Sequence, residues 1–345
     1  MQKKERNAAV DALKGLMILL IILHHSQLLP FLRHGYLGVD VFFMIAGFYL
    51  MQHFSLKKGS ATSYSLQRIK GVYLPYLIAL VLACILDYKR LVSFDGFEGF
   101  VETYAPFTAF LTLTEELGFV FHTPVILVGG WFLSVLIIGG FLLYGLLEFN
   151  ERLTIKVILP FSILLGFTFY FSQSATAESF SILGALSFPL LRGFLEMGTG
   201  VLLNTFIREQ KGLLQQKPIC VMLLSIAALV MFCIMVLAEV SLDGFLVIVI
   251  PLLLLGVMAP DSLLKRIYDR CPTKLLAGLG ALSLEAYLIH QPVLHIVHSC
   301  FTHSSLPVRP VFIVPADLVA VIFAAFLLRL VCGWIKKTTK KQQDA

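Results

Sequence analysis

The chain has 345 residues, of which 58% are hydrophobic and only 14% are charged, and its mean hydropathy is +0.87. These values exclude a soluble globular domain and predict an all-α polytopic membrane protein that resides in a lipid bilayer. The net charge of +6 does not indicate a nucleic-acid partner, because the basic residues sort by loop. The cysteines show neither CxxC nor Cys/His spacing, so no metal is expected.

Apolar stretches of spanning length predict about ten transmembrane helices. Twenty Lys and Arg residues fall in segments assigned to the inside and four in those assigned to the outside, which predicts two cytoplasmic termini. The domain expectation is one transmembrane domain over 1–335 and a basic cytoplasmic tail over 336–345. The expected spans are 8–30, 36–53, 71–88, 126–147, 155–172, 188–207, 217–238, 242–259, 276–300 and 308–335.

The first expected span carries two ionisable residues, Lys14 and His25, eleven positions apart. Eleven residues are close to three helical turns, so both side chains point from one face about 16 Å apart. An ionisable group within a membrane helix is costly, and it is therefore interpreted as lining a cavity enclosed by protein. Lys14 lies in the cytoplasmic third, and His25 lies some five residues from the outer end.

Asp40 comes about four residues into the second expected span, at nearly the depth of His25 on the neighbouring antiparallel helix. A carboxylate beside an imidazole fixes its tautomer and raises its basicity, as a general base for a hydroxyl requires. The alternative is structural: an imidazole satisfied by a backbone carbonyl and a carboxylate that caps a helix start.

Arg68 and Lys70 begin the third expected span, at the same rim as Lys14. Fixed cations at the mouth of a membrane cavity suit a phosphate-bearing ligand. For Lys70 the positive-inside rule is a sufficient alternative explanation.

The ninth expected span holds Glu285, Tyr287 and His290 within an apolar run, and Pro292 is expected to kink it. This pattern is typical of a helix that lines a substrate channel.

Two further features have structural alternatives. Arg192 and Glu196 form an i,i+4 pair of opposite charge, which a structural ion pair would explain. Trp131 is placed near the outer interface, where tryptophans are common anchors. The acidic loop over 89–125 is either an interfacial helix that walls an acceptor site or a solvated lid.

Several of these motifs occur in the same order along the sequences of one membrane-protein family. The chain resembles the acyltransferase-3 family of integral membrane O-acyltransferases. The resemblance rests on Lys14 with His25, Gly38 through Phe43, Trp131-Phe132-Leu133, and Ser283 with Tyr287 through His290 and Pro292.

The resemblance implies an acyl-CoA donor that reaches the protein from the cytoplasm, a catalytic His25 and an Asp40 partner. It also implies donor contacts at Lys14, Arg68 and Lys70. The chain departs from the family pattern with Gly71 where members carry an arginine, with apolar Leu136 where many carry an acid, and with Glu285.

The expected function is transfer of an acyl group, most simply acetyl from acetyl-CoA, to a hydroxyl of a cell-envelope glycan or lipid-linked glycan. His25 would act as general base or acyl relay, and Trp131, Tyr287, His290 and Glu285 would line the substrate channel. The expected location is a bacterial plasma membrane, with a homodimer or a separate extracellular partner left open. A transporter or flippase that uses the same residues is the rival, and a silent scaffold is a third alternative.

Overall fold

The computed structural model describes residues 7–57, 59–86, 109, 111–114, 127, 129–172, 182–183, 186–260, 262–270, 274–302 and 310–343. Most of the 89–125 loop lies outside these residues.

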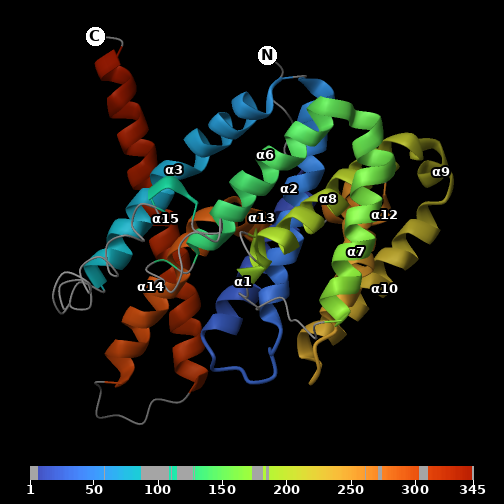
Figure 1. Ribbon diagram of the computed structural model, residues 1–345. Helices are drawn as coiled ribbons and strands as arrows, with labels where there is room; N and C mark the ends of the chain where they lie inside the picture. Colours follow the sequence, from blue (N-terminus) through green and yellow to red (C-terminus); the bar gives the residue numbers. More distant parts are fainter. Residues whose placement is uncertain are drawn as a thin grey trace.

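The described residues form a bundle of helices (Figure 1). A small antiparallel hairpin, β1 (Ile182–Leu183) with β2 (Leu186–Ser187), precedes α8. Short 3₁₀-helices cover Gly35–Leu37 and Asp243–Phe245, and a π-helix covers Thr154–Ile158. The α-helices are α1 (Ala8–His25), α2 (Gly38–Leu56), α3 (Ala61–Leu86), α6 (Gly130–Leu153), α7 (Leu159–Ser172), α8 (Phe188–Glu209), α9 (Lys211–Gln216), α10 (Pro218–Leu237), α11 (Leu246–Met258), α12 (Leu263–Arg270), α13 (Lys274–Ala281), α14 (Ser283–Thr302) and α15 (Pro310–Gln343).

The all-helical class is therefore confirmed. Among the described residues, six helical segments are long and apolar enough to cross a membrane, or up to seven if α11 and α12, bent by 55°, form one span. The long helices α8 and α14 are outside this set, although both were expected spans. Both carry charged or polar residues in their interiors, and these residues contribute to the site described below.

Several helix boundaries differ from the expected spans. α1 ends at His25, because Gln27 adopts a positive φ of 56° and the chain turns before Pro30. His25 is therefore the last helical residue and not five residues short of the outer end. At the other end of the chain, α15 continues through the basic residues 336–341 to Gln343.

The apolar run from α6 to α7 is broken at Asn150, whose backbone is non-helical with φ −159° and ψ 96°. The Asn150 Oδ1 atom accepts a hydrogen bond of 2.9 Å from the backbone N–H of Leu153, as a helix N-cap does. Figure 1 shows the chain turning over at this break, so that α7 descends beside α8.

Glycines allow two pairs of helices to cross at backbone contact. On α2 and α8, a Cβ added to Gly47 would lie 1.9 Å from the Met197 carbonyl oxygen, and one on Gly200 would lie 2.1 Å from that of Met44. Between α1 and α13, a Cβ on Gly280 would lie 1.7 Å from the Asp11 carbonyl oxygen. Small residues at crossings are typical of packing between membrane helices. The crossings fix α1, α2 and α8, which carry much of the site.

The α2–α3 junction and the C-terminal end of α15 lie at the same edge of the bundle, the upper edge in Figure 1. At this junction the side chain of Glu148 on α6 accepts a 2.8 Å hydrogen bond from the backbone N–H of Ala61 and thereby caps α3. The sequence assigns this edge to the cytoplasmic side.

Candidate active site in the helical bundle

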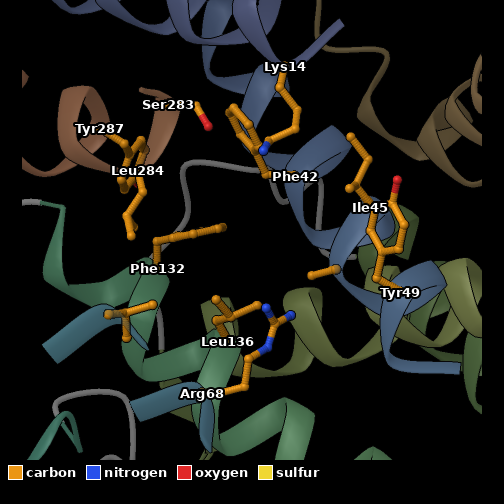
Figure 2. Close-up of a pocket in the computed structure, with 12 residues that line it drawn as sticks. Lys14, Phe42, Ile45, Tyr49, Arg68, Phe132, Leu136, Ser283, Leu284 and Tyr287 are labelled. Carbon is orange, nitrogen blue, oxygen red and sulfur yellow. The ribbon is translucent and has the colours of Figure 1, made fainter. Parts of the chain in front are cut away.

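An open cavity of about 310 Å³ lies between α1, α2, α3, α6 and α14. Its size is in the range of small-molecule sites. It brings together three residues that were singled out in the sequence, Lys14, Arg68 and Tyr287. Figure 2 shows Lys14 reaching the cavity from α1 on one side and Arg68 from α3 on the opposite side, with Tyr287 on a third wall.

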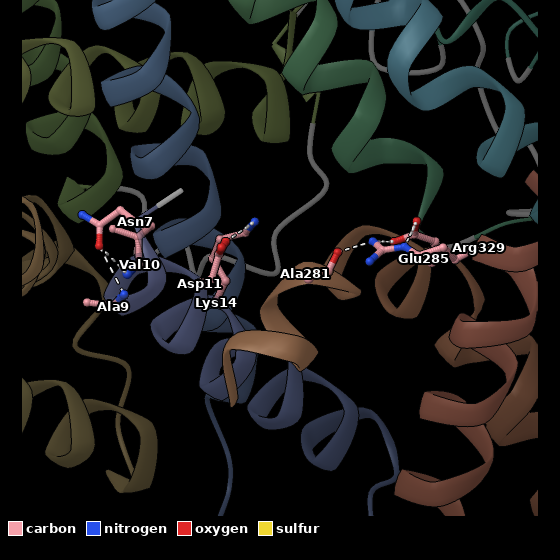
Figure 3. A network of polar contacts seen from close by, with 8 residues as sticks. All are labelled: Asn7, Ala9, Val10, Asp11, Lys14, Ala281, Glu285 and Arg329. Atoms are coloured by element: carbon pink, nitrogen blue, oxygen red, sulfur yellow. Dashed lines mark hydrogen bonds and ion pairs between the residues drawn. The ribbon is translucent and has the colours of Figure 1, made fainter. Parts of the chain in front are cut away.

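The Lys14 ammonium group lies 3.6 Å from an Asp11 carboxylate oxygen, one turn earlier on α1 (Figure 3). The side chain of Lys14 is 25% exposed and that of Asp11 is 11% exposed. This i,i+3 pair limits the rotamers of Lys14 and supplies a counter-charge while no ligand is present. An anionic ligand in the cavity would therefore compete with Asp11 for the ammonium group.

The Arg68 guanidinium is held in place by Tyr64, one turn earlier on α3. Its Nε donates a 3.2 Å hydrogen bond to the Tyr64 hydroxyl, and its Cζ lies 5.7 Å from the centre of the Tyr64 ring. That ring stacks on Tyr144 of α6 at 4.7 Å and 18°. The cation at the cavity wall is thus preorganised by a packed aromatic pair.

Lys70 does not line this cavity and is exposed on α3. Two residues along a helix turn the side-chain direction by about 200°, so Lys70 points away from the face that Arg68 uses. Of the two basic residues expected on the third span, only Arg68 lies at the cavity.

On α14, Ser283, Tyr287 and His290 follow one another at spacings of four and three, which places them on one face. Ser283 and Tyr287 line the cavity, and the Tyr287 ring lies 5.0 Å from that of Phe132. His290 continues this face one turn further along, where its ring lies 5.4 Å from Tyr287.

The His290 side chain is only 1% exposed. Its Nδ1 lies 2.5 Å from the Tyr287 carbonyl oxygen, and because a carbonyl only accepts, Nδ1 carries the proton. In the neutral ring Nε2 is therefore an acceptor, and it is buried without a hydrogen-bond partner among the described residues. The ring of His25 lies 5.0 Å from that of His290. The two histidines thus form a pair at the end of α1.

Asp40 was expected beside His25, but its ion-pair partner in the structure is Arg192 of α8. The distances from Asp40 Oδ1 are 2.6 Å to Arg192 Nη2 and 2.8 Å to Nε. The same guanidinium lies 3.1 Å from Glu196. Asp40, Arg192 and Glu196 are 0%, 4% and 2% exposed. The sequence indicated the Arg192–Glu196 pair. It did not indicate that Asp40 is the third member of this ion cluster.

The ring of Trp131 packs beside the ion cluster of Asp40, Arg192 and Glu196. Its ring lies 5.8 Å from the Arg192 Cζ and 5.9 Å from the ring of Phe43. The next residue, Phe132, lines the cavity. Trp131 is not among the described residues that line the cavity, and its ring packs at 6.4 Å against that of Phe132, which does line it.

Glu285 was expected to line the channel, and it lies instead between α14 and α15. Its two carboxylate oxygens accept hydrogen bonds of 2.9 and 2.8 Å from Arg329, which also donates to the Ala281 carbonyl (Figure 3). A bidentate pair of this kind is a strong helix-to-helix contact. The ion pair with Arg329 is sufficient to explain the presence of a carboxylate at position 285, and no ligand is needed to explain it.

The arrangement joins two kinds of chemistry. Lys14 and Arg68 provide cations for an anionic ligand, while Tyr287, His290 and His25 extend from that cavity as a hydrogen-bonding and proton-accepting series. The Asp11–Lys14 and Tyr64–Arg68 contacts each join residues three or four positions apart on one helix, so helical spacing in the sequence is enough to indicate them. The contact between Asp40 and Arg192 joins distant segments, and no local spacing indicates it.

A helical membrane protein with a cation-lined cavity beside a pair of histidines, of which His290 is buried, is suited to transferring a group from an anionic donor. The acyltransferase-3 family model, described as an acyltransferase domain, matches residues 7–335. The chain therefore belongs to this family of membrane acyltransferases. Comparisons with curated proteins and with solved structures give no significant match.

Proposed function

We propose that the protein moves an acetyl group from acetyl-CoA, bound from the cytoplasmic side, to a hydroxyl of a cell-envelope glycan or lipid-linked glycan. The observation that carries the proposal is the continuity of the site. The cavity lined by Lys14 and Arg68 adjoins Tyr287, which contacts His290, which in turn contacts His25.

The donor end of the site is supported by charge and space. Coenzyme A carries several phosphate groups, and Lys14 and Arg68 offer one cation on each of two opposing walls. Arg68 is the stronger candidate for phosphate, because Tyr64 fixes its planar guanidinium. Lys70, exposed on the other face of α3, would contribute only long-range attraction.

The reaction itself is assigned to the histidine pair. The acceptor hydroxyl attacks the thioester carbonyl carbon while an imidazole of His25 or His290 removes its proton. The carbon–sulfur bond then breaks, and the proton passes to the departing thiolate, so free CoA and an acyl ester are formed. Alternatively, His25 takes the acyl group first and passes it to the acceptor.

Distance along α1 sets a requirement on the donor. Lys14 and His25 are about 16 Å apart along the helix, so the pantetheine arm would thread from the cavity past Tyr287 toward the histidines. The Tyr287 hydroxyl is placed to donate to the developing oxyanion on this path. Asp40 would contribute indirectly, because its ion pair with Arg192 holds α2 against α8.

The same proposal includes the membrane topology and the location of the protein. We propose ten spans with both termini in the cytoplasm of a bacterial plasma membrane, so that the donor cavity faces inward and His25 lies toward the outer face. The acceptor would reach the histidines from outside or from the outer leaflet. A homodimer or an extracellular partner would add to this site without supplying its donor contacts.

Purified protein in detergent or nanodiscs tests the proposal. Incubation with acetyl-CoA labelled in the acetyl group, over a panel of envelope glycans, should yield free CoA and a glycan that has gained one acetyl mass. A transporter would instead move labelled substrate across a proteoliposome membrane without any release of thiol. That result would reject the enzymatic proposal.

A further inference from the structure

A second cavity of about 380 Å³ lies where the C-terminal ends of α2 and α8 approach the start of α1. Tyr49 lines both this cavity and the first one, so the two spaces are neighbours across one side chain. The residues that give the second cavity its chemistry are Phe48, Tyr49, Gln52, Ser55, Asn204 and Arg208.

The polar interior of this cavity is defined by Asn204, which is 3% exposed. Its Nδ2 donates a 3.1 Å hydrogen bond to the carbonyl oxygen of Phe48, and this contact fixes the orientation of the amide. The remaining oxygen, Oδ1, is buried and has no partner among the described residues, and the same is true of Oε1 of Gln52. Buried amide oxygens without a partner are costly unless a ligand supplies N–H donors.

The rest of the lining adds an anion contact and flat apolar surfaces. The exposed Arg208 hydrogen-bonds through its guanidinium to the Ser55 hydroxyl. The rings of Phe48 and Tyr49 lie 5.6 Å apart and nearly perpendicular, at 87°. A ligand that satisfies this lining has N–H donors, an aromatic ring and a negative group.

We propose that this second cavity binds the adenosine 3′-phosphate end of the acyl donor. The exocyclic amine of adenine donates to Asn204 Oδ1 and Gln52 Oε1, the base packs on the aromatic rings, and Arg208 binds the 3′-phosphate. The chain of the donor then passes Tyr49 into the first cavity, where Lys14 and Arg68 bind the pyrophosphate. This inference rests on the proposed function, because it assumes a CoA-type donor.

The test uses the full protein and adenosine 3′,5′-bisphosphate, which is the nucleotide end of coenzyme A without the pantetheine arm. Its affinity is measured by isothermal titration or thermal shift, so the readout does not depend on turnover. Asn204→Leu and Arg208→Gln should each weaken binding about 10-fold. They should raise the KM for acetyl-CoA by a similar factor while leaving the KM for acetyl-pantetheine unchanged.

Thr205→Val is the matched control. Thr205 is the buried neighbour of Asn204 on α8, its hydroxyl donates a 3.1 Å hydrogen bond to the Val201 carbonyl oxygen, and it does not line the cavity. This variant should bind the nucleotide as the wild type does. Gln52→Leu, near the end of α2, gives a second test if Asn204→Leu does not fold.

Undiminished nucleotide binding by folded Arg208→Gln and Gln52→Leu would overturn the inference. So would equal losses for acetyl-CoA and acetyl-pantetheine, because these would place the effect outside the nucleotide site. The proposed function fails in a different way. In that case the wild type would release no thiol from acetyl-CoA with any acceptor, whatever its affinity for the nucleotide.

Discussion

The imidazole rings of His25 and His290 lie 5.0 Å apart, although one belongs to the first helix and the other to α14 near the end of the chain. Nδ1 of His290 is held by the Tyr287 carbonyl, and its Nε2 is left as a buried acceptor. The pair therefore has the geometry of a proton-accepting centre next to the cavity.

His290→Gln should lower kcat by about 100-fold, because general acid–base groups contribute about 10²–10⁴-fold. The KM for acetyl-CoA should change little, since the donor cations are on other helices. Thiol release against donor concentration measures both constants. His295→Gln, an exposed histidine on the same helix, serves as the control and should behave as the wild type. A pure KM effect at His290 would remove it from the proton-transfer step.

Arg68→Ala and Lys14→Ala should each raise the KM for acetyl-CoA by about tenfold, because charged hydrogen bonds contribute about 1.5–3 kcal/mol. Tyr64→Phe should give a smaller rise, since it removes only the hydroxyl that orients Arg68. Steady-state kinetics over a range of ionic strengths provide the measurement. Lys70→Ala is the matched control, and a KM effect there as large as at Arg68 would refute the assignment of the cavity cations.

Arg192→Met should destabilise the protein by about 3–5 kcal/mol, because it leaves the carboxylates of Asp40 and Glu196 buried without their cation. Thermal unfolding in detergent reports the change. The triple variant Arg192→Met, Asp40→Asn, Glu196→Gln should recover part of the loss, since it removes the uncompensated charges. Equal melting temperatures for the wild type and Arg192→Met would show that the ion cluster does not hold α2 to α8.

Gly47→Ala should destabilise the crossing of α2 and α8 by about 1–3 kcal/mol or more, because its Cβ would lie 1.9 Å from the Met197 carbonyl oxygen. Gly71→Ala is the opposite case. That glycine lies within α3 with nothing within 4 Å of an added Cβ, so alanine should stabilise the helix by about 0.5–1 kcal/mol. Unfolding of the two variants side by side tests the packing, and a stable Gly47→Ala would contradict it.

The sequence predicted the class and most helices because hydropathy reports contact with lipid directly. It placed the third span at 71–88, whereas α3 begins at Ala61, because the first turns of that helix are polar and carry Tyr64 and Arg68. Hydropathy marks the apolar part of a helix and not its start. The end of α1 was likewise missed, because a turn at Gln27 and not a loss of hydropathy ends it.

Within the site, local spacing was informative and distant pairing was not. Lys14, Arg68 and Tyr287 were expected at a cavity and they line one. Asp40 was assigned to His25 from their depths alone, whereas the structure pairs it with Arg192. Glu285 was expected to line the channel, because nothing in the sequence indicated its partner Arg329 on α15. Such pairs depend on which helices pack together, and that information is tertiary.

The most direct test of the central claim is release of CoA by His25→Ala beside the wild type, with the acceptor that gives the highest turnover. The variant should retain the wild-type melting temperature and donor affinity while losing about 10²–10⁴-fold in kcat. Undiminished CoA release by the folded variant would contradict the assignment of the reaction to the histidine pair.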